Sequence, residues 1–299
     1  MMQDIRAYMR LVQEETERAL RRYLPKHAPD TLQEAIAYSL FAGGKRLRPL
    51  FHFATLEALG AERSIGYPVV AALEMVHTYS LIHDDLPAMD NDDLRRGKPT
   101  NHKVFGEAVA ILAGDALQAQ AFFALSDLLS FPGLPPAKLL VLFQGFARAI
   151  GAEGMVGGQV LDLEAEGKNI ELDALEHLHR LKTGSLIVFS VESAAILGGA
   201  KAKEHEALVR YARALGLAFQ VQDDILDVIG DEKMLGKKTR QDDIQQKSTY
   251  PALIGLEEAQ KFRDRLIEEA KQALDVLTEE RQSIQILFAI ADLVGTRES

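Results

Sequence analysis

Cysteine and tryptophan are both absent from this chain of 299 residues. The lack of cysteine excludes disulfide bonds, thiolate metal ligands and a thiol nucleophile, and it is compatible with a reducing compartment. Aromatic residues make up only 7% of the sequence, but 47% of it is hydrophobic and 26% is charged. This composition is typical of a globular chain that buries a large core.

The sequence also gives no sign of a targeting signal, a membrane span or a strongly basic surface. The first ten residues, MMQDIRAYMR, are charged and contain no apolar signal-peptide core. We find no apolar run that approaches the ~18 residues needed to cross a bilayer. We therefore expect no membrane span and a cytoplasmic location. Forty-four acidic against 34 basic residues give a formal charge of -10, which disfavours a nucleic-acid partner because phosphate backbones require a basic surface.

Strand patterns are nearly absent, because β-branched residues rarely alternate with polar ones. Apolar residues instead recur every three or four positions among Ala, Leu, Glu, Gln, Lys and Arg, which is the helical period and composition. Segment 172–199 follows this pattern without interruption. Segments 106–129 and 208–229 are apolar over much of their circumference, so we expect them at the centre of a helical bundle.

Glycine, proline and polar residues predict breaks between helices at 24–30, 41–49, 59–68, 130–138 and 166–172. None of these breaks is long or polar enough to link two domains. The sequence therefore predicts an all-α fold in which residues 1–299 form a single-domain bundle of about ten helices.

Aspartates are concentrated in the segment HDDLPAMDNDDLRRG, residues 83–97, which holds five of them within ten residues. Like charges this close on a helix repel by roughly 0.2–0.5 kcal/mol per pair, so a compensating ligand is expected. Asp84 and Asp90 converge only if the helix ends between them. Pro87 supplies that break because it lacks a backbone donor and disfavours a helical residue before it.

A second cluster lies in QVQDDILDV, residues 220–228. Asp223 and Asp227 are four apart and share one helix face, with Asp224 about 100° to the side. Clustered carboxylates suit hard divalent ions such as Mg²⁺, which is often shared with substrate phosphates. Either cluster alone is also explained by a solvated acidic surface or a helix cap. The presence of two clusters, each next to an apolar helix, favours metal binding over these explanations.

Cations occur in separate groups. GGKRLRP, residues 43–49, follows a Gly-Gly turn and opens a helix, which predicts Lys45 and Arg48 on one face. His77 lies two turns before Asp84 and about 20° off the same face. Further donors are Arg95, Arg96, Lys182, Thr183 and Lys237. Arg and Lys are the usual phosphate binders, although any one of these cations, or a core histidine at His77, has an ordinary structural explanation.

Together the aspartates and cations indicate one or two substrates that carry phosphates. There is no Walker-type GxxxxGK[ST] loop, and the adjoining helices offer nothing polar enough to recognise a sugar or a base. We therefore expect the organic part of the substrate to be apolar.

Six segments resemble, in this order, those of the trans-prenyl diphosphate synthases: GGKRLRP, DDLPAMDNDDLRRG, GMVGGQVLDLEAEGK, LHRLKTG, FQVQDDILDVIGD and QKSTYP. The resemblance spans roughly residues 30–260 and is closest to the bacterial farnesyl diphosphate synthases; the combination is specific, although each motif alone is not. Gln246 stands where glycine is usual, and the tail IADLVGTRES matches loosely.

This resemblance implies an isoprenoid synthase fold with a central cavity, normally homodimeric, and a role for each motif residue. The residues implied as ligands of Mg²⁺, at three ions per active site, are Asp84, Asp85, Asp90, Asp223 and Asp227. Those implied to contact the allylic diphosphate are Arg95, Lys182, Thr183, Gln220 and Lys237. Those implied to bind isopentenyl diphosphate are Lys45, Arg48, His77 and Arg96. The implied catalytic set is Asp84, Asp85, Asp90, Arg95, Lys182 and Asp223.

The implied reaction joins isopentenyl diphosphate head-to-tail to dimethylallyl and geranyl diphosphate. An allylic C–O bond ionises when Mg²⁺ and fixed cations stabilise the departing pyrophosphate. An apolar cavity keeps water from the carbocation, and the double bond of isopentenyl diphosphate attacks from a fixed position. A proton is then lost to the pyrophosphate itself, since the sequence offers no dedicated base.

Tyr79 and Ser80 lie about one turn before Asp84 on the same predicted helix. Burial alone would favour each added five-carbon unit by about 4 kcal/mol, at ~0.8 kcal/mol per methylene, so only a steric wall stops elongation. An aromatic residue at this place, with a first aspartate motif two residues longer, resembles the fifteen-carbon enzymes. Tyr79 as plain core filling is the alternative.

Other functions stay open at this point. The same fold makes shorter or longer chains, as in geranyl and geranylgeranyl diphosphate synthases. A terpene cyclase would have no use for Lys45, Arg48 and His77. A non-catalytic prenyl-diphosphate-binding subunit would not need both aspartate clusters intact.

Overall fold

The computed structural model describes residues 2–229, 248–278 and 284–296. The structure is 79% helical, and twelve helices in the described part have eight residues or more, so the predicted all-α class is confirmed. The α-helices are α1 (Met2–Tyr23), α2 (Asp30–Leu40), α3 (Leu47–Ala58), α4 (Tyr67–Asp84), α5 (Asn101–Phe105), α6 (Glu107–Ser126), α7 (Pro136–Ile150), α8 (Met155–Ala165), α9 (Leu172–His179), α10 (Ser185–Leu197), α11 (Ala202–Ile229), α14 (Tyr250–Ile254), α15 (Leu256–Ala273), α16 (Asp275–Thr278) and α17 (Gln285–Gly295). Two 3₁₀ turns, η1 (Arg63–Gly66) and η2 (Asp127–Ser130), and one π-helical turn, η3 (Arg180–Gly184), complete the helical part.

All five predicted breaks fall between helices. One small hairpin was not expected: β1 (Leu94–Arg95) pairs with β2 (Lys98–Pro99) in antiparallel register. Its two-residue loop is Arg96-Gly97, and both residues have positive φ, at 53° and 73°. Such a loop suits the twist of two short strands. The hairpin follows the first aspartate motif directly and fixes where Arg95 and Arg96 lie.

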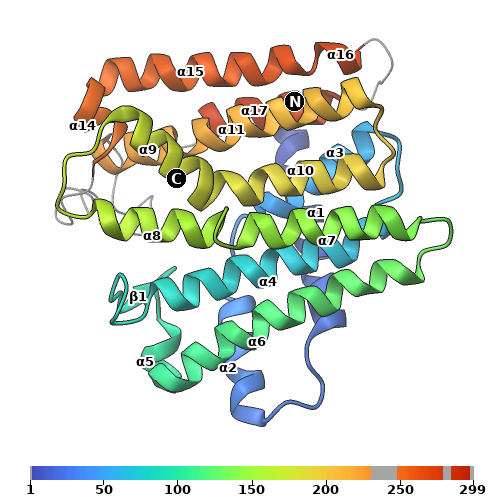
Figure 1. The fold of residues 1–299 in the computed structure, drawn as a ribbon, viewed down its shortest axis with the longest axis vertical. Helices are drawn as coiled ribbons and strands as arrows, with labels where there is room; N and C mark the ends of the chain where they lie inside the picture. Colours follow the sequence, from blue (N-terminus) through green and yellow to red (C-terminus); the bar gives the residue numbers. More distant parts are fainter. Residues whose placement is uncertain (1, 230–247, 279–283, 297–299) are drawn as a thin grey trace.

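The long helices run side by side across the molecule (Figure 1), from α6 at the bottom through α4, α7 with α8, α10 and α11 to α15 at the top. Twelve of the 18 residues of α4 and nine of the 13 residues of α10 are buried. Both helices are apolar on nearly all sides, which is why they occupy the interior. The carboxyl end of α4 carries the first aspartate motif.

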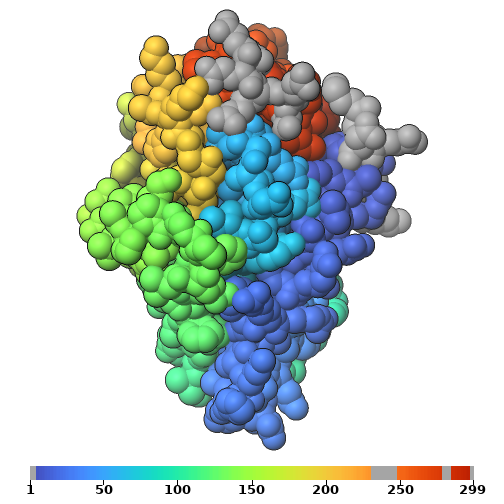
Figure 2. All heavy atoms as spheres, turned by 90° about the vertical axis from the view of Figure 1, so that its right-hand side faces the viewer, coloured from blue at the N-terminus to red at the C-terminus, as the bar shows by residue number. Residues whose placement is uncertain are grey.

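Segments that are distant in the chain pack together. Figure 2 shows blue residues from the start of the chain beside green residues from its middle. Arg22 and Tyr23 of α1, for example, both donate hydrogen bonds to Asp127 of η2.

The expectation for segment 208–229 is confirmed, because most of this part of α11 is buried. The expectation for segment 106–129 is wrong. Only seven of the 20 residues of α6 are buried, and Leu112 and Phe123 are 57% and 62% exposed. This helix packs along α4 with its small residues and leaves an apolar side uncovered.

Three helical stretches are long and apolar enough to cross a membrane, judged by length and composition alone: Arg63–Asp84, Glu107–Ser130 and Pro136–Ala165. From the sequence alone we expected no membrane span. The most apolar window of the first stretch is 72% buried inside the structure, so a core position accounts for its composition. The other two windows are each 39% buried and leave apolar side chains on the surface.

Candidate active site

The first aspartate motif lies where α4 ends. The helix stops at Asp84, three residues before Pro87, and the chain then turns back. The backbone N–H of Asp90 donates to the carbonyl oxygen of Asp84 at 2.8 Å. Asn91, with a positive φ of 53°, donates to the carbonyl of Leu86 and closes the turn. The break predicted at Pro87 is confirmed, and it brings Asp84 and Asp90 together.

The two carboxylates meet at an electrostatic cost. Burial raises the pKa of Asp84 to about 6, and the nearby Asp90 also raises it, against the opposing effect of Lys182. The Oδ1 atom of Asp90 is buried and has no hydrogen-bond partner in the described part of the chain. A buried carboxylate oxygen without a partner is unfavourable, so this site fits a cation.

Asp85 lies apart from this pair. Its Oδ1 accepts from Nε of Arg95 at 2.7 Å and from Nη2 at 2.6 Å. Arg95 itself comes from β1, so the hairpin delivers an arginine to the end of α4. The sequence reading assigned Asp85 and Arg95 separately and missed this ion pair.

The second aspartate cluster lies near the end of α11, as predicted. Asp223 is half-buried and Asp227 is 4% exposed. Asp224 faces elsewhere, and its Oδ2 accepts from the backbone N–H of Tyr250 at 3.0 Å. Among the described residues, no three His, Asp or Glu side chains lie close enough together to hold a metal ion by themselves. An ion bound here would need ligands beyond the side chains that the structure describes.

Lys182 and Thr183 lie in η3, the π-helical turn between α9 and α10. The Nζ of Lys182 contacts Oδ2 of Asp162 at 2.6 Å. Glycine is required opposite this turn, because a Cβ at Gly158 of α8 would lie 2.2 Å from the backbone nitrogen of Lys182. Single π turns inside helices are frequent at functional sites.

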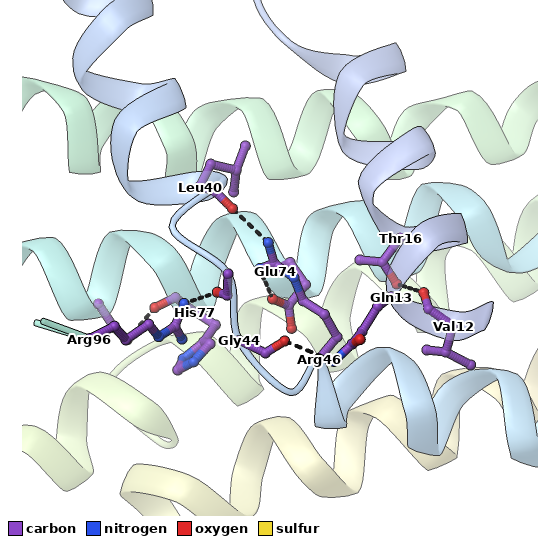
Figure 3. A network of polar contacts seen from close by, with 11 residues as sticks. Val12, Gln13, Thr16, Leu40, Gly44, Arg46, Glu74, His77 and Arg96 are labelled. Carbon is purple, nitrogen blue, oxygen red and sulfur yellow. Dashed lines mark hydrogen bonds and ion pairs between the residues drawn. The ribbon is translucent and has the colours of Figure 1, made fainter. Parts of the chain in front are cut away.

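The GGKRLRP segment does not form one helical face. Lys45 precedes α3, and Arg46 adopts the left-handed conformation with φ 51°, so the shared face predicted for Lys45 and Arg48 is wrong. Arg46 instead turns inward, where it contacts Glu74 of α4 at 2.5 Å and donates to the carbonyl of Leu40 at 2.7 Å (Figure 3). The sequence reading missed this pair. Its signal was Glu74, the only charged residue within the apolar run 69–76.

Three basic side chains gather beside this loop. His77 is held neutral, because burial and the nearby Arg48 and Arg96 lower its pKa well below the usual value. The Nε atom of Arg48 is buried without a hydrogen-bond partner in the described part of the protein. Arg96 donates to the carbonyl of Gly43, and a side chain at Gly44 would collide with its guanidinium (Figure 3).

A cavity of about 550 Å³ is lined by some of these residues but not by Asp85, Asp90, Arg95, Arg96, Asp223 or Asp227. The predicted residues that line it are Arg48, His77, Tyr79, Ser80, Asp84, Lys182 and Thr183. Gln220 lines a smaller adjoining cavity of about 150 Å³ that also contains Lys182. Lys237 and Gln246 lie outside the described residues. Apolar side chains cover much of the larger cavity, among them Leu86, Met89, Met155 and Leu163.

A model of the polyprenyl synthetase family matches residues 29–287 of the chain. The chain belongs to the polyprenyl synthetase family. It is 53% identical over 241 residues to the farnesyl diphosphate synthase of Geobacillus stearothermophilus, a match that covers 80% of this chain and 81% of that protein. It is 45% identical over 299 residues to the chloroplastic heterodimeric geranylgeranyl pyrophosphate synthase large subunit 1 of Arabidopsis thaliana, covering 99% and 80% of the two chains.

Solved structures of polyprenyl synthetases share this fold. The crystal structure of an FPP/GFPP synthase from Zymomonas mobilis, solved in its apo form, matches with a TM-score of 0.86 at 40% sequence identity. The match covers 98% of this chain and all of that one, at 100%. The isoprenoid synthase fold expected from the motifs is confirmed for this polyprenyl synthetase.

Proposed function

We propose that the chain is a prenyltransferase that condenses isopentenyl diphosphate with dimethylallyl and then geranyl diphosphate to form (2E,6E)-farnesyl diphosphate. One observation carries the proposal. A single cavity is lined by Asp84 and Lys182, from the motifs assigned to the allylic substrate, and by Arg48 and His77, from those assigned to isopentenyl diphosphate. Two diphosphate sites beside one largely apolar space suit the joining of two short prenyl chains.

The two diphosphates bind separate groups of side chains in this proposal. Those for the allylic diphosphate are Arg95, Lys182, Thr183, Gln220 and Lys237. Those for isopentenyl diphosphate are Lys45, Arg48, His77 and Arg96. His77 acts as a neutral hydrogen-bond donor, because the neighbouring arginines keep its pKa low.

Mg²⁺, at three ions per site, is the cofactor we propose, with Asp84, Asp85, Asp90, Asp223 and Asp227 as its ligands. The orphaned Oδ1 of Asp90 and the raised pKa of Asp84 support a cation at the first motif. Asp85 has only its Oδ2 to offer, since Arg95 occupies Oδ1. When bound, the metal supplies positive charge to the departing pyrophosphate.

The side chains of this chain then have three tasks. Lys182 and Arg95 add fixed positive charge where the pyrophosphate leaves, which stabilises the ionised state. The apolar lining around Leu86, Met89 and Met155 excludes water from the allylic cation. The cations around Arg48 hold isopentenyl diphosphate so that its double bond meets that cation, and the proton lost afterwards goes to the pyrophosphate oxygen.

Tyr79 and Ser80 set the product length in this proposal. Both line the cavity, and Tyr79 is only 7% exposed. A buried ring one helical turn from Asp84 lies where a growing tail would arrive. A geranylgeranyl or longer product is the second candidate, because the Arabidopsis relative with that name aligns along 99% of the chain.

We further propose that residues 1–299 form one domain and that two copies form a homodimer in the cytoplasm. The dimer is supported by the apolar side of α6 and α7, where Leu112, Phe123 and Leu140 are 57%, 62% and 65% exposed. A second copy seated there would cover the apolar surface that otherwise resembles a membrane span. A Phe123→Asp variant should then shift the sedimentation of the protein from dimer to monomer.

The function is tested by product analysis. The purified chain is incubated with Mg²⁺, labelled isopentenyl diphosphate and each allylic primer, and the products are dephosphorylated and sized. Five- and ten-carbon primers should both give a fifteen-carbon alcohol, whereas the fifteen-carbon primer should give little product. Incorporation of no label with any primer would favour the non-catalytic subunit and contradict the proposal.

A further inference from the structure

The His83 side chain packs on α6 in a space, its seat, that exists only because residue 114 is glycine. The Nε2 atom of His83 lies 3.0 Å from the carbonyl oxygen of Ile111. A Cβ built at Gly114 would lie 2.1 Å from the same Nε2 and 2.6 Å from Cδ2 of the ring. Glycine is unfavourable inside a helix, so its presence in the middle of α6 has a packing reason. The imidazole fills the space that a side chain at position 114 would take.

The ring of Tyr79 rests on this histidine. Tyr79 and His83 are one turn apart on α4, and their rings meet edge to face with centroids 5.6 Å apart and planes at 72°. The hydroxyl of Tyr79 is buried and has no hydrogen-bond partner among the described residues. No hydrogen bond therefore anchors the tyrosine, and packing against His83 fixes the direction of its ring.

Both rings line the 550 Å³ cavity, together with Ile111, whereas Gly114 does not. We propose that His83, seated on Gly114, is a specificity-determining residue that sets how far Tyr79 reaches into the prenyl cavity and so sets the product length. This inference rests on the proposed wall at Tyr79. It adds that the wall is held from behind by α6.

Substitutions of Gly114 and of His83 should change the product length in opposite directions. Gly114→Ala forces the imidazole out of its seat and toward Tyr79, which reduces the space for the tail and shifts product toward ten carbons. His83→Ala empties the seat and frees the tyrosine ring to turn into it, which shifts product toward twenty carbons. In the double variant the new Cβ enters vacated space, so the distribution should return toward fifteen carbons.

The experiment measures product distribution, because a loss of stability alone does not alter chain length. Wild type, Gly114→Ala, His83→Ala and the double variant are incubated with isopentenyl diphosphate and dimethylallyl diphosphate under Mg²⁺. Circular dichroism checks each fold. Gly145→Ala is the matched control, since a Cβ there would make only an ordinary 3.4 Å contact with the Phe189 ring. We expect several-fold changes in the ten- and twenty-carbon shares for the single variants and none for the control.

A wild-type distribution from folded Gly114→Ala or from His83→Ala would overturn the inference. If Gly114→Ala fails to fold, the double variant decides, because it should fold and make mainly fifteen-carbon product. Tyr79→Ala, run alongside, separates this inference from the wall on which it rests. If Tyr79→Ala gives longer products and His83→Ala gives the wild-type distribution, Tyr79 limits chain length without help from His83. If both variants still make fifteen-carbon product, the role proposed for Tyr79 is wrong as well.

Discussion

Arg46 and Glu74 form an ion pair at 2.5 Å whose side chains are 3% and 2% exposed. The pair ties the loop that carries Lys45 to α4, one turn before His77. A buried charge that loses its partner is costly, because neither water nor another group replaces the contact.

We therefore expect Glu74→Gln to lower the free energy of unfolding by about 3–5 kcal/mol in urea titrations. The helical pair between Glu176 and Arg180, whose side chains are 21% and 53% exposed, is the control, and Glu176→Gln should cost only about 0.5 kcal/mol. The double variant Arg46→Met with Glu74→Leu should recover much of the loss, since no lone charge stays buried. Similar small losses for Glu74→Gln and Glu176→Gln would contradict this account of the loop.

Asp84→Ala should reduce turnover by about 10²-fold or more while the helical fold survives, because the lost carboxylate supports the leaving group mainly in the transition state. Initial rates at saturating substrates and Mg²⁺ measure this effect. Asp93→Asn is the control from the same loop, since Asp93 is exposed and pairs with Lys103. Near-normal turnover for Asp84→Ala would show that Asp84 has been assigned wrongly.

The two diphosphate sites should separate in steady-state kinetics. Arg48→Ala should raise the KM for isopentenyl diphosphate more than that for the allylic primer, because a lost contact weakens the ligand that made it. Lys182→Ala should show the reverse preference. Equal increases for both substrates in both variants would argue against two distinct sites.

The buried His52 should make the protein sensitive to acid. Burial lowers its pKa to about 4, and its Nδ1 lies 2.9 Å from the carbonyl oxygen of Ser190. In the unfolded chain His52 therefore takes up a proton near pH 6.5, whereas in the folded chain it stays neutral until the pH falls to about 4. Stability is unaffected by this group above pH 6.5 and falls as the pH decreases through that window, by about 3 kcal/mol in all.

His52→Asn keeps a donor for Ser190 but cannot take up the proton. Between pH 5 and 6, the slope of unfolding free energy against pH should decrease by roughly 1 kcal/mol per pH unit relative to wild type. Guanidinium titrations at several pH values give the slope, and the exposed His27→Asn should leave it unchanged. An identical slope in His52→Asn and wild type would mean that another group causes the acid sensitivity.

Local patterns in the sequence predicted the backbone arrangement around both aspartate clusters. The convergence of Asp84 and Asp90 depends on Pro87, and the shared face of Asp223 and Asp227 depends on helical spacing. Both features involve neighbours in the chain, so periodicity and turn chemistry were sufficient. The same holds for the five helix breaks.

Contacts between distant segments were beyond such reasoning. Arg46 turns inward only because Glu74 lies opposite, and this reversal overturned the predicted face of Lys45 and Arg48. The π turn at Lys182 forms against α8 at Gly158. The apolar sequence of α6 is typical of a core helix, yet how much of the helix is buried depends on which elements pack against it. Each of these features requires the tertiary arrangement.

We expect two diphosphates to bind at separate sites around one cavity. The decisive measurement is a crystal structure of the protein with Mg²⁺, isopentenyl diphosphate and the thio-analogue of dimethylallyl diphosphate, whose carbon–sulfur bond resists ionisation. We predict the analogue's diphosphate with Mg²⁺ between Asp84 and Asp223, beside Lys182, and isopentenyl diphosphate on Arg48, His77 and Arg96. Binding of the analogue on Arg48, or of both ligands in alternation at one site, would contradict the account.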